Sequence, residues 1–152
     1  MDYKSKIILI AGPTASGKSK IAINLAKKVN GEIVNADSMQ VYKQLKILTA
    51  RPSEKDQKTI KHHLFGIIDV RKRFSTGQWL KKCIKIINQI RKKNKTPIIV
   101  GGTGLYFKAL VDGLVSIPKL EPSEKNKILK LHKKLGQKQF YKKLVKLDPV
   151  SK

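Results

Sequence analysis

Two hydrophobic patterns alternate along most of the chain: short continuous apolar runs, and longer stretches with an apolar residue every three or four positions. The continuous runs are typical of strands buried on both faces, and the periodic stretches are typical of helices. Strands are predicted at residues 6–11, 32–36 and 97–100, with a weaker one at 64–68, and helices at 18–28, 75–91 and 105–111. Residues 39–63 are mixed and polar, and predict loop and short helix. Strands that alternate with helices predict an α/β fold, a parallel sheet flanked by helices.

The end of the chain has a different pattern, in which helical spacing is not followed by a further strand. Pro122 interrupts the chain, Ser123 is predicted to cap a helix, and Gly136 is predicted to break that helix before a second one begins. The apolar positions of the two helices are Ile128, Leu131, Leu135, Phe140, Leu144 and Leu147. The sequence therefore predicts an α/β core over residues 1–117 and a helical tail over residues 118–152, whose apolar faces need a surface to pack on.

Charge is the feature of the composition that most changes this picture. The 152 residues include 34 Lys and Arg against 10 Asp and Glu, a net charge of +24. Such a charge suits a polyanionic partner such as nucleic acid. However, 30 of the basic residues are Lys and 4 are Arg, although guanidinium is the usual choice for bidentate phosphate contacts. Drift of composition over the whole chain explains the charge equally well.

Other counts narrow the class of protein. No apolar run approaches the roughly 18 residues of a membrane helix, so no membrane is expected. The single cysteine, Cys83, excludes an internal disulfide and fits a reducing cytoplasm. It falls on the apolar face of a predicted helix, where it is expected to pack. With one cysteine and three histidines, a structural zinc site is not expected.

The strongest chemical signal follows the first predicted strand. There the chain has the spacing G-x-x-x-x-G-K-S, formed by Gly12, Pro13, Thr14, Ala15, Ser16, Gly17, Lys18 and Ser19. Gly12 and Gly17 allow backbone angles and close approaches that a Cβ would block. The loop N–H groups and the following helix N-terminus then face an anion, Lys18 adds a positive charge, and Ser19 offers a hydroxyl to Mg²⁺. The motif predicts a phosphate site without identifying whose phosphate it binds.

Two further polar residues follow predicted strands, at the sheet edge where parallel sheets bind their ligands. Asp37 suits a general base or a magnesium ligand, although a carboxylate there can instead cap the segment from Ser38 onward. Thr103 stands among glycines that present its hydroxyl, or is an ordinary turn residue. Val100 is followed by Gly101 rather than by the metal-binding Asp of a nucleotide-hydrolysing motor. This favours a transferase.

The histidine pair and the single tryptophan favour structural or packing roles over metal binding or catalysis. His62 and His63 are adjacent, so on a strand they point to opposite sides and do not easily share a metal. Loop packing or substrate contact is favoured over catalysis. Trp79 falls at an apolar helical position and is expected in the core.

Five segments, in this order, resemble the tRNA dimethylallyltransferase family, also called tRNA isopentenyltransferase. They are Gly12 to Ser19, Asp37 to Tyr42 (D-S-M-Q-V-Y), Thr49 to Pro52 (T-A-R-P), His62 to Leu64 (H-H-L) and Gly101 to Tyr106 (G-G-T-G-L-Y). The resemblance is dense over residues 7–115 and thinner in the tail. It implies a P-loop NTPase-like fold in which the tail begins a helical tRNA-binding insertion. It also implies transfer of a dimethylallyl group from dimethylallyl diphosphate to N6 of the adenosine 3′-adjacent to the tRNA anticodon, with release of diphosphate.

The family pattern implies a role for each candidate residue. The loop from Gly12 to Ser19 would bind the diphosphate or a nucleotide, with Mg²⁺ held through Ser19. Lys18 would stabilise the leaving group. Asp37 would accept the N6 proton, and Thr103 would contact the reacting groups. The tRNA, with its target base flipped out of the stack, would be bound by Asp37, Ser38, Met39, Gln40, Thr103 and Lys125, the last of which replaces a usual Arg.

The resemblance also leaves questions of length and activity. Family members are longer, so a segment that completes the core and grips the anticodon arm is expected outside these residues. The chain would act as a monomer or together with that segment. Three alternatives stay open: a small-molecule kinase in which Asp37 activates a hydroxyl, an adenylate isopentenyltransferase, and an inactive truncated remnant. The D-S-M-Q-V-Y and H-H-L motifs favour the tRNA enzyme.

Overall fold

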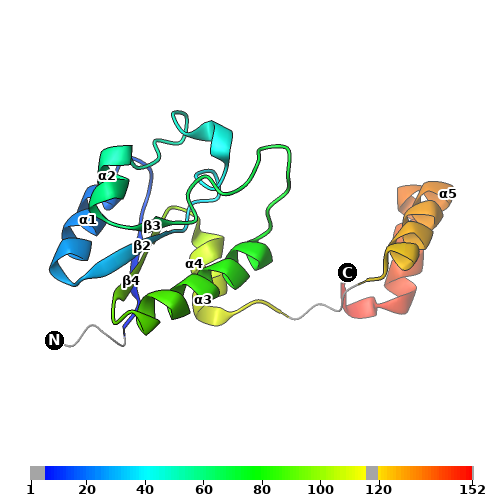
Figure 1. Cartoon of the computed structure of the whole chain (residues 1–152). Coiled ribbons are helices and arrows are strands. Elements are labelled where there is room, and N and C mark those ends of the chain that lie inside the picture. The colour runs from blue at the N-terminus through cyan, green and yellow to red at the C-terminus, as the bar shows by residue number, and fades with distance from the viewer. Residues whose placement is uncertain (1–5, 116–119, 152) are drawn as a thin grey trace. The chain divides into compact units, whose positions relative to one another are not determined.

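The computed structural model describes residues 6–115 and 120–151. It divides into two compact units, Met1–Leu114 and Val115–Lys152 (Figure 1). The first unit contains a four-stranded parallel sheet with helices on both faces, which confirms the predicted α/β class. The predicted boundary between residues 117 and 118 lies outside the described residues.

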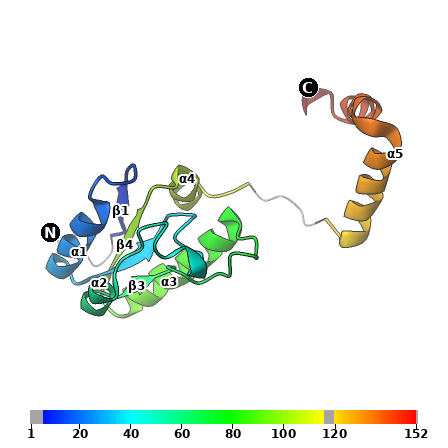
Figure 2. The same cartoon turned by 90° about the horizontal axis from the view of Figure 1, so that it is seen from above.

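The sheet has the strand order β1-β4-β2-β3, and every neighbouring pair is parallel (Figure 2). The strands are β1 (Ile8–Ala11), β2 (Gly31–Asn35), β3 (His62–His63) and β4 (Thr96–Gly101). The helices are α1 (Lys18–Lys28), η1 (Lys43–Leu45), α2 (Glu54–Thr59), α3 (Thr76–Lys92), α4 (Gly104–Asp112), α5 (Pro122–Leu147) and η2 (Pro149–Ser151). Ile99 of β4 lies opposite Leu9 on one side and Val34 on the other, so β4 joins β1 to β2.

Alternate side chains of the strands enter two separate cores. On one face, Ile33 and Ile98 pack with Ala22 and Ala26 of α1. On the other face, the core joins β2 and β4 to α3 and α4, through Val34, Ile99, Trp79, Cys83, Ile87, Ile90, Tyr106 and Phe107. Both β2 and β4 are buried along their whole length, as expected for strands covered on both faces.

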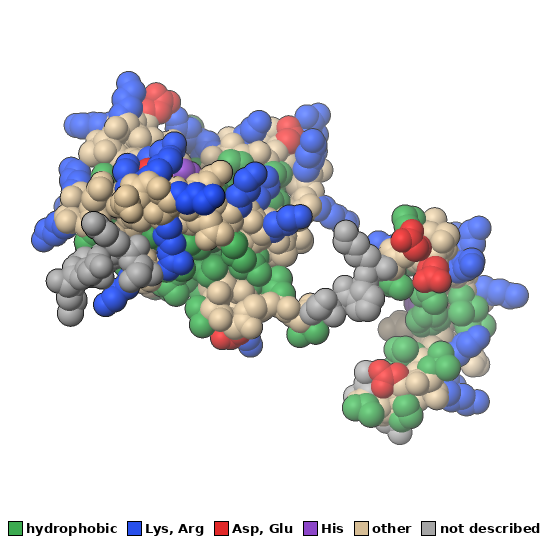
Figure 3. Space-filling view, turned by 60° about the horizontal axis from the view of Figure 1, so that its bottom comes forward, with side chains coloured by type: hydrophobic (Ala, Val, Ile, Leu, Met, Phe, Trp, Pro, Cys, Tyr) green, Lys and Arg blue, Asp and Glu red, His purple; other side chains and the backbone are tan. Residues whose placement is uncertain are grey.

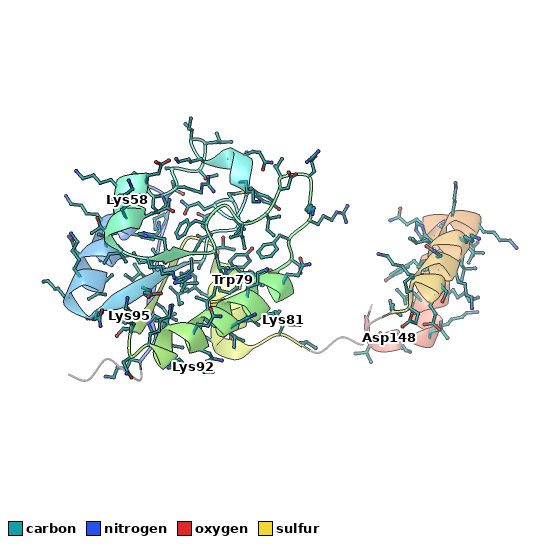
Figure 4. All side chains as sticks on the ribbon, viewed as in Figure 1. Lys58, Trp79, Lys81, Lys92, Lys95 and Asp148 are labelled. Carbon is teal, nitrogen blue, oxygen red and sulfur yellow. The ribbon has the colours of Figure 1, made fainter. Side chains whose placement is uncertain are left out.

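Trp79 and Cys83 are both core residues, as predicted. The Trp79 ring stacks on Tyr106 with centroids 4.2 Å apart and an interplanar angle of 11°. Figure 4 shows Trp79 between α3 and the sheet, with Lys81 and Lys92 on the outer side of the same helix. Burial raises the pKa of the Cys83 thiol to about 12, so this cysteine packs as an apolar side chain.

The predicted strand at residues 64–68 is wrong. Strand β3 comprises His62 and His63 alone, because the chain then turns through two left-handed residues, Leu64 with φ 63° and Gly66 with φ 58°. An added Cβ at Gly66 would overlap the guanidinium group of Arg51. The bare backbone of Gly66 therefore lets Arg51 pack against this turn.

Helix α3 begins close to the predicted position, residue 75, and is capped there. The Ser75 hydroxyl caps the helix by accepting a hydrogen bond from the backbone N–H of Gln78. In return, the Gln78 side-chain oxygen accepts a hydrogen bond from the Ser75 N–H at 2.9 Å. This capping box satisfies two N–H groups that the first helical turn would otherwise leave unpaired. None of the helices in residues 6–115 and 120–151 combines the length and the apolar character needed to span a membrane.

In the second unit, the predicted Ser123 cap is wrong and the predicted break is confirmed. Glu121 is the N-cap, and Pro122 occupies the first helical turn, where its missing N–H costs nothing. Gly136 has φ 70° and ψ 166° and interrupts the helix. The two halves meet where the rings of His132 and Phe140 contact edge-on at 4.9 Å. No described residue of α5 is fully buried.

Candidate functional site

A cavity of about 620 Å³ opens beside the carboxyl ends of the strands. It combines charged and polar groups with apolar side chains from five segments of the chain, within residues 14–22, 33–40, 48–52, 62–65 and 100–101. Its lining comprises Thr14, Ala15, Gly17, Lys18, Ser19, Lys20, Ala22, Ile33, Asp37, Met39, Gln40, Leu48, Thr49, Ala50, Pro52, His62, Phe65, Val100 and Gly101. The cavity therefore suits a ligand that carries both negative charge and apolar groups.

The phosphate-binding loop reaches this cavity through Lys18 and Ser19. Gly17 has φ 78° at the N-cap of α1, a conformation that glycine adopts without strain. The Lys18 ammonium donates to the Pro13 carbonyl, and Ser16 Oγ donates to the same carbonyl at 2.8 Å. Gly12, Pro13 and Ser16 are absent from the cavity lining, so they shape the loop from outside.

Asp37 lines the same cavity and also caps the turn after it. Its Oδ1 accepts hydrogen bonds from the backbone N–H groups of Met39 at 2.8 Å and Gln40 at 3.3 Å. The structure thus contains the capping interaction that sequence reasoning held as the alternative to a catalytic role. The two are compatible, because neither backbone bond uses Oδ2.

Thr103 is connected to the Asp37 segment, but neither Thr103 nor Ser38 belongs to the cavity lining. The Thr103 hydroxyl oxygen accepts from the Ser38 N–H at 2.9 Å and lies 3.3 Å from Ser38 Oγ. The Thr103 N–H donates to the Ala36 carbonyl at 3.1 Å. Thr103 therefore braces the start of α4 against the segment that carries Asp37.

The two histidines diverge, as their adjacency predicted. His62 lines the cavity, contacts the ring of Phe65 edge-on at 5.5 Å and places Nδ1 2.6 Å from the Ile60 carbonyl. Burial lowers the pKa of His62, opposed by that hydrogen bond. His63 instead places Nε2 2.7 Å from the carboxylate of Glu32.

Sequence reasoning missed this buried carboxylate. Glu32 is 2% exposed, and its second oxygen accepts from the Lys95 ammonium at 3.0 Å. Burial acts to raise the pKa of Glu32, but the hydrogen bonds from His63 and Lys95 outweigh it and the pKa is lowered. The available signal was a charged residue inside a buried strand, which requires a partner.

Asn35 was also missed. Its side chain is buried, and its amide donates to the Asp37 carbonyl at 3.0 Å and the Leu64 carbonyl at 3.2 Å. Its oxygen accepts from the Asp37 N–H at 2.9 Å, and the Trp79 indole N–H donates to the Asn35 backbone carbonyl at 2.8 Å. An Asn at the end of an apolar strand was the available signal, because a buried amide must find hydrogen-bond partners.

Lys125 and the basic charge of the chain are described apart from this cavity, because Lys125 is not among its lining residues. Lys125 is exposed on α5, in the second unit. On the face in Figure 3, basic side chains spread over both units rather than gathering at one place. In the described parts of the chain, no group of three or more His, Cys, Asp or Glu residues is placed to hold a metal ion.

The fold and the site together define a class. A parallel sheet in which β1 leads through a G-x-x-x-x-G-K-S loop into α1, with the loop lysine lining a cavity at the strand ends, is the core of a P-loop protein of the NTPase-like type.

Comparisons identify the family within that class. A family model described as IPP transferase matches residues 40–152. A tRNA dimethylallyltransferase from Pelagibacter ubique (strain HTCC1062) is 64% identical over 149 residues, which cover 98% of this chain and 48% of that protein. The chain therefore belongs to the IPP transferase family, as its motifs indicated. It spans about half the length of the curated relatives that it matches.

Solved structures agree with this assignment. The full-length tRNA isopentenylpyrophosphate transferase from Bacillus halodurans matches with a TM-score of 0.72 and 33% identity, over 96% of this chain and 48% of that one. A eukaryotic dimethylallyltransferase acting on tRNA matches with a TM-score of 0.80 and 35% identity, over 94% of this chain and 36% of that one. Both likenesses extend over nearly the whole chain.

Proposed function

We propose that the protein transfers a dimethylallyl group from dimethylallyl diphosphate to N6 of the adenosine 3′-adjacent to the anticodon of tRNA and releases diphosphate. The observation that carries this proposal is the composition of one cavity. Lys18 and Asp37 line it together with apolar side chains, among them Met39, Leu48 and Phe65. A donor with a diphosphate head and a hydrocarbon tail needs both kinds of surface. The names of the relatives support the same reaction.

The phosphate-binding loop acts on the leaving group. As the bond between the allylic carbon and oxygen breaks, negative charge builds on the diphosphate. The Lys18 ammonium, the loop N–H groups and the N-terminus of α1 stabilise that charge. The Ser19 hydroxyl, which lines the cavity, is an oxygen ligand of the kind that Mg²⁺ prefers. Ser19 would hold Mg²⁺ here, and the ion would supply further positive charge to the diphosphate.

Asp37 acts on the acceptor. The adenine amine is a weak nucleophile because its lone pair is delocalised into the ring. As N6 attacks the allylic carbon, the electron pair of the breaking bond leaves with the diphosphate, and one N6 proton passes to Asp37. Oδ1 is used by the N–H groups of Met39 and Gln40, so Oδ2 takes the proton. Met39 and Gln40 also line the cavity, where they bind the flipped base.

The decisive experiment changes the base without changing its shape. Asp37→Asn keeps an oxygen for the Met39 and Gln40 bonds but cannot accept a proton. We expect turnover to fall by roughly 10²–10⁴ while donor binding is retained. Asp69→Asn is the matched control, because Asp69 bonds Arg71 and Gln44 outside the cavity. Turnover within a few-fold of the parent in Asp37→Asn would reduce Asp37 to a capping residue.

Substrate tests separate the remaining alternatives. Lys18→Ala should abolish binding of dimethylallyl diphosphate, because it removes the loop cation. Thr103→Ala should lower turnover less than Asp37→Asn, since Thr103 acts through Ser38. Labelled donor with tRNA should give prenylated RNA, whereas prenylation of AMP alone would indicate an adenylate isopentenyltransferase. Tight ATP binding with phosphate transfer to a small molecule would indicate a kinase.

A further inference from the structure

We infer that Asn35 is a positioning residue that fixes the direction of the Asp37 carboxylate and its place relative to the cavity wall. This inference rests on the proposed function of Asp37. Asn35 itself is absent from the cavity lining, so its effect on the reaction passes through its neighbours.

The geometry fixes Asp37 from both sides. The Asn35 side chain accepts from the Asp37 N–H at 2.9 Å and donates to the Asp37 carbonyl at 3.0 Å. The peptide groups before and after the Asp37 Cα are therefore both held by one planar amide. Once these two peptide groups are fixed, the direction of the Cα–Cβ bond that carries the carboxylate is fixed as well.

The same amide also reaches a second segment that contributes to the cavity lining. Its second N–H donates to the Leu64 carbonyl at 3.2 Å. Leu64 lies between His62 and Phe65, which both line the cavity. One side chain thus links the backbone that carries the Asp37 carboxylate to the segment that carries His62 and Phe65.

The three hydrogen bonds of the Asn35 side chain form a clamp on Asp37 and Leu64, and Asn35 is itself held in place. Asn35 is fully buried, and the indole N–H of the buried Trp79 donates to its backbone carbonyl at 2.8 Å. Asn is the fitting residue, because it offers two donor hydrogens and an acceptor in one short group. An Asp of the same shape keeps the acceptor but leaves the carbonyls of Asp37 and Leu64 without a donor. A buried carboxylate facing two carbonyl oxygens is also repelled by them.

The test is Asn35→Asp in the 152-residue chain, with two measurements. In the first, amide hydrogen exchange by NMR should accelerate about tenfold or more at Met39 and Gln40, whose N–H groups Asp37 caps. The indole signal of Trp79, the single tryptophan, should keep its position and show that the core is intact. Affinity for inorganic diphosphate, which reports on the loop, should be unchanged. If the indole signal is lost, the same measurements are made on Asn35→Ser, because the serine hydroxyl is short and uncharged.

The second measurement is turnover. A misplacement of about 1 Å costs on the order of 10²-fold, so kcat should fall about 10²-fold with KM for dimethylallyl diphosphate unchanged. Gln44→Glu is the matched control. Both the nitrogen and the oxygen of the Gln44 amide form hydrogen bonds: the nitrogen donates to Asp69 at 2.9 Å and the oxygen accepts from the Val70 N–H at 3.0 Å. Gln44 is not among the residues that line the cavity. This control should leave kcat and the exchange of Met39 and Gln40 unchanged.

The outcomes are distinguishable. Unchanged exchange at Met39 and Gln40 together with unchanged kcat would overturn the inference. Equal losses of kcat and of diphosphate affinity, or the same losses in Gln44→Glu, would also overturn it, because they indicate general destabilisation. Accelerated exchange alongside full turnover in Asp37→Asn would support the clamp and refute the base assignment in the proposed function.

Discussion

Gly101 makes a close backbone contact that a methyl group should destroy. It ends β4 beside the chain that follows β2, where Ala36 N–H donates to the Val100 carbonyl at 2.8 Å and Thr103 N–H donates to the Ala36 carbonyl at 3.1 Å. A Cβ at Gly101 would overlap the Ala36 carbonyl group and lie 2.8 Å from its Cα. Because the atoms it meets are backbone, no side-chain rotation relieves the overlap.

The size of the effect follows from these contacts. Carbon atoms in contact lie about 3.5–4.0 Å apart, whereas the new Cβ would overlap the Ala36 carbonyl carbon, so Gly101→Ala must separate the two segments by more than about 1 Å. Overpacking of this kind costs about 1–3 kcal/mol, and each buried backbone group left without its hydrogen bond adds about 1–3 kcal/mol. We therefore expect Gly101→Ala to lower the free energy of unfolding by about 3 kcal/mol or more.

Gly104 provides the matched control. It is the first residue of α4, and a Cβ there meets no atom within 4 Å. Gly104→Ala should leave stability unchanged or raise it by up to about 1 kcal/mol, because Ala restricts the unfolded chain. Urea unfolding followed by the fluorescence of Trp79, the single tryptophan, measures both variants. A Gly101→Ala protein within about 0.5 kcal/mol of the parent would refute the steric argument.

Three further expectations follow from individual residues. The pKa of Glu32 is lowered from 4.5 in the folded chain, so its contribution to stability is complete above about pH 4.5 and is lost as pH falls through the lower folded value. Glu32→Gln should reduce stability at pH 7 and flatten the acid limb of a pH titration of unfolding. With its pKa raised to about 12, Cys83 should resist alkylation at pH 8 until the chain unfolds, and rapid labelling of the folded chain would contradict its burial. Lys125→Ala should weaken tRNA binding modestly without changing donor binding, and tRNA affinity should fall steeply with salt; affinity independent of salt would indicate that the charge is compositional drift.

The parts of the fold and of the site that could be predicted are those whose pattern lies in residues close together in the sequence. The apolar run before the phosphate-binding loop predicted β1, and the helical spacing from residue 75 to 91 predicted α3, because strand burial and helical periodicity are visible in neighbouring residues. The loop spacing predicted that Lys18 and Ser19 would face a ligand cavity, and both line one. Their roles in binding and catalysis stay predictions.

The parts that were missed depend on partners far along the chain. Asn35 finds the Leu64 carbonyl 29 residues away, and Glu32 finds Lys95 63 residues away. Neither partner is visible in a local window of sequence. The misplaced third strand has a different cause, because the left-handed backbone at Leu64 is uncommon for a residue other than Gly, Asn or Asp.

The strand order β1-β4-β2-β3 has a consequence for how the molecule folds. Among the four strands of the described sheet, the one that comes last in the sequence, β4, joins β1 to β2, so neither β2 nor β3 pairs with β1 to bring the loop beside Asp37. A nascent chain synthesised through α3 already contains both groups but has no sheet that joins them. The cavity forms only when residues 96–101 insert between β1 and β2. Such long-range pairing predicts slow folding of the first unit, because the loop-closure entropy of the intervening residues must be overcome before β4 can pair.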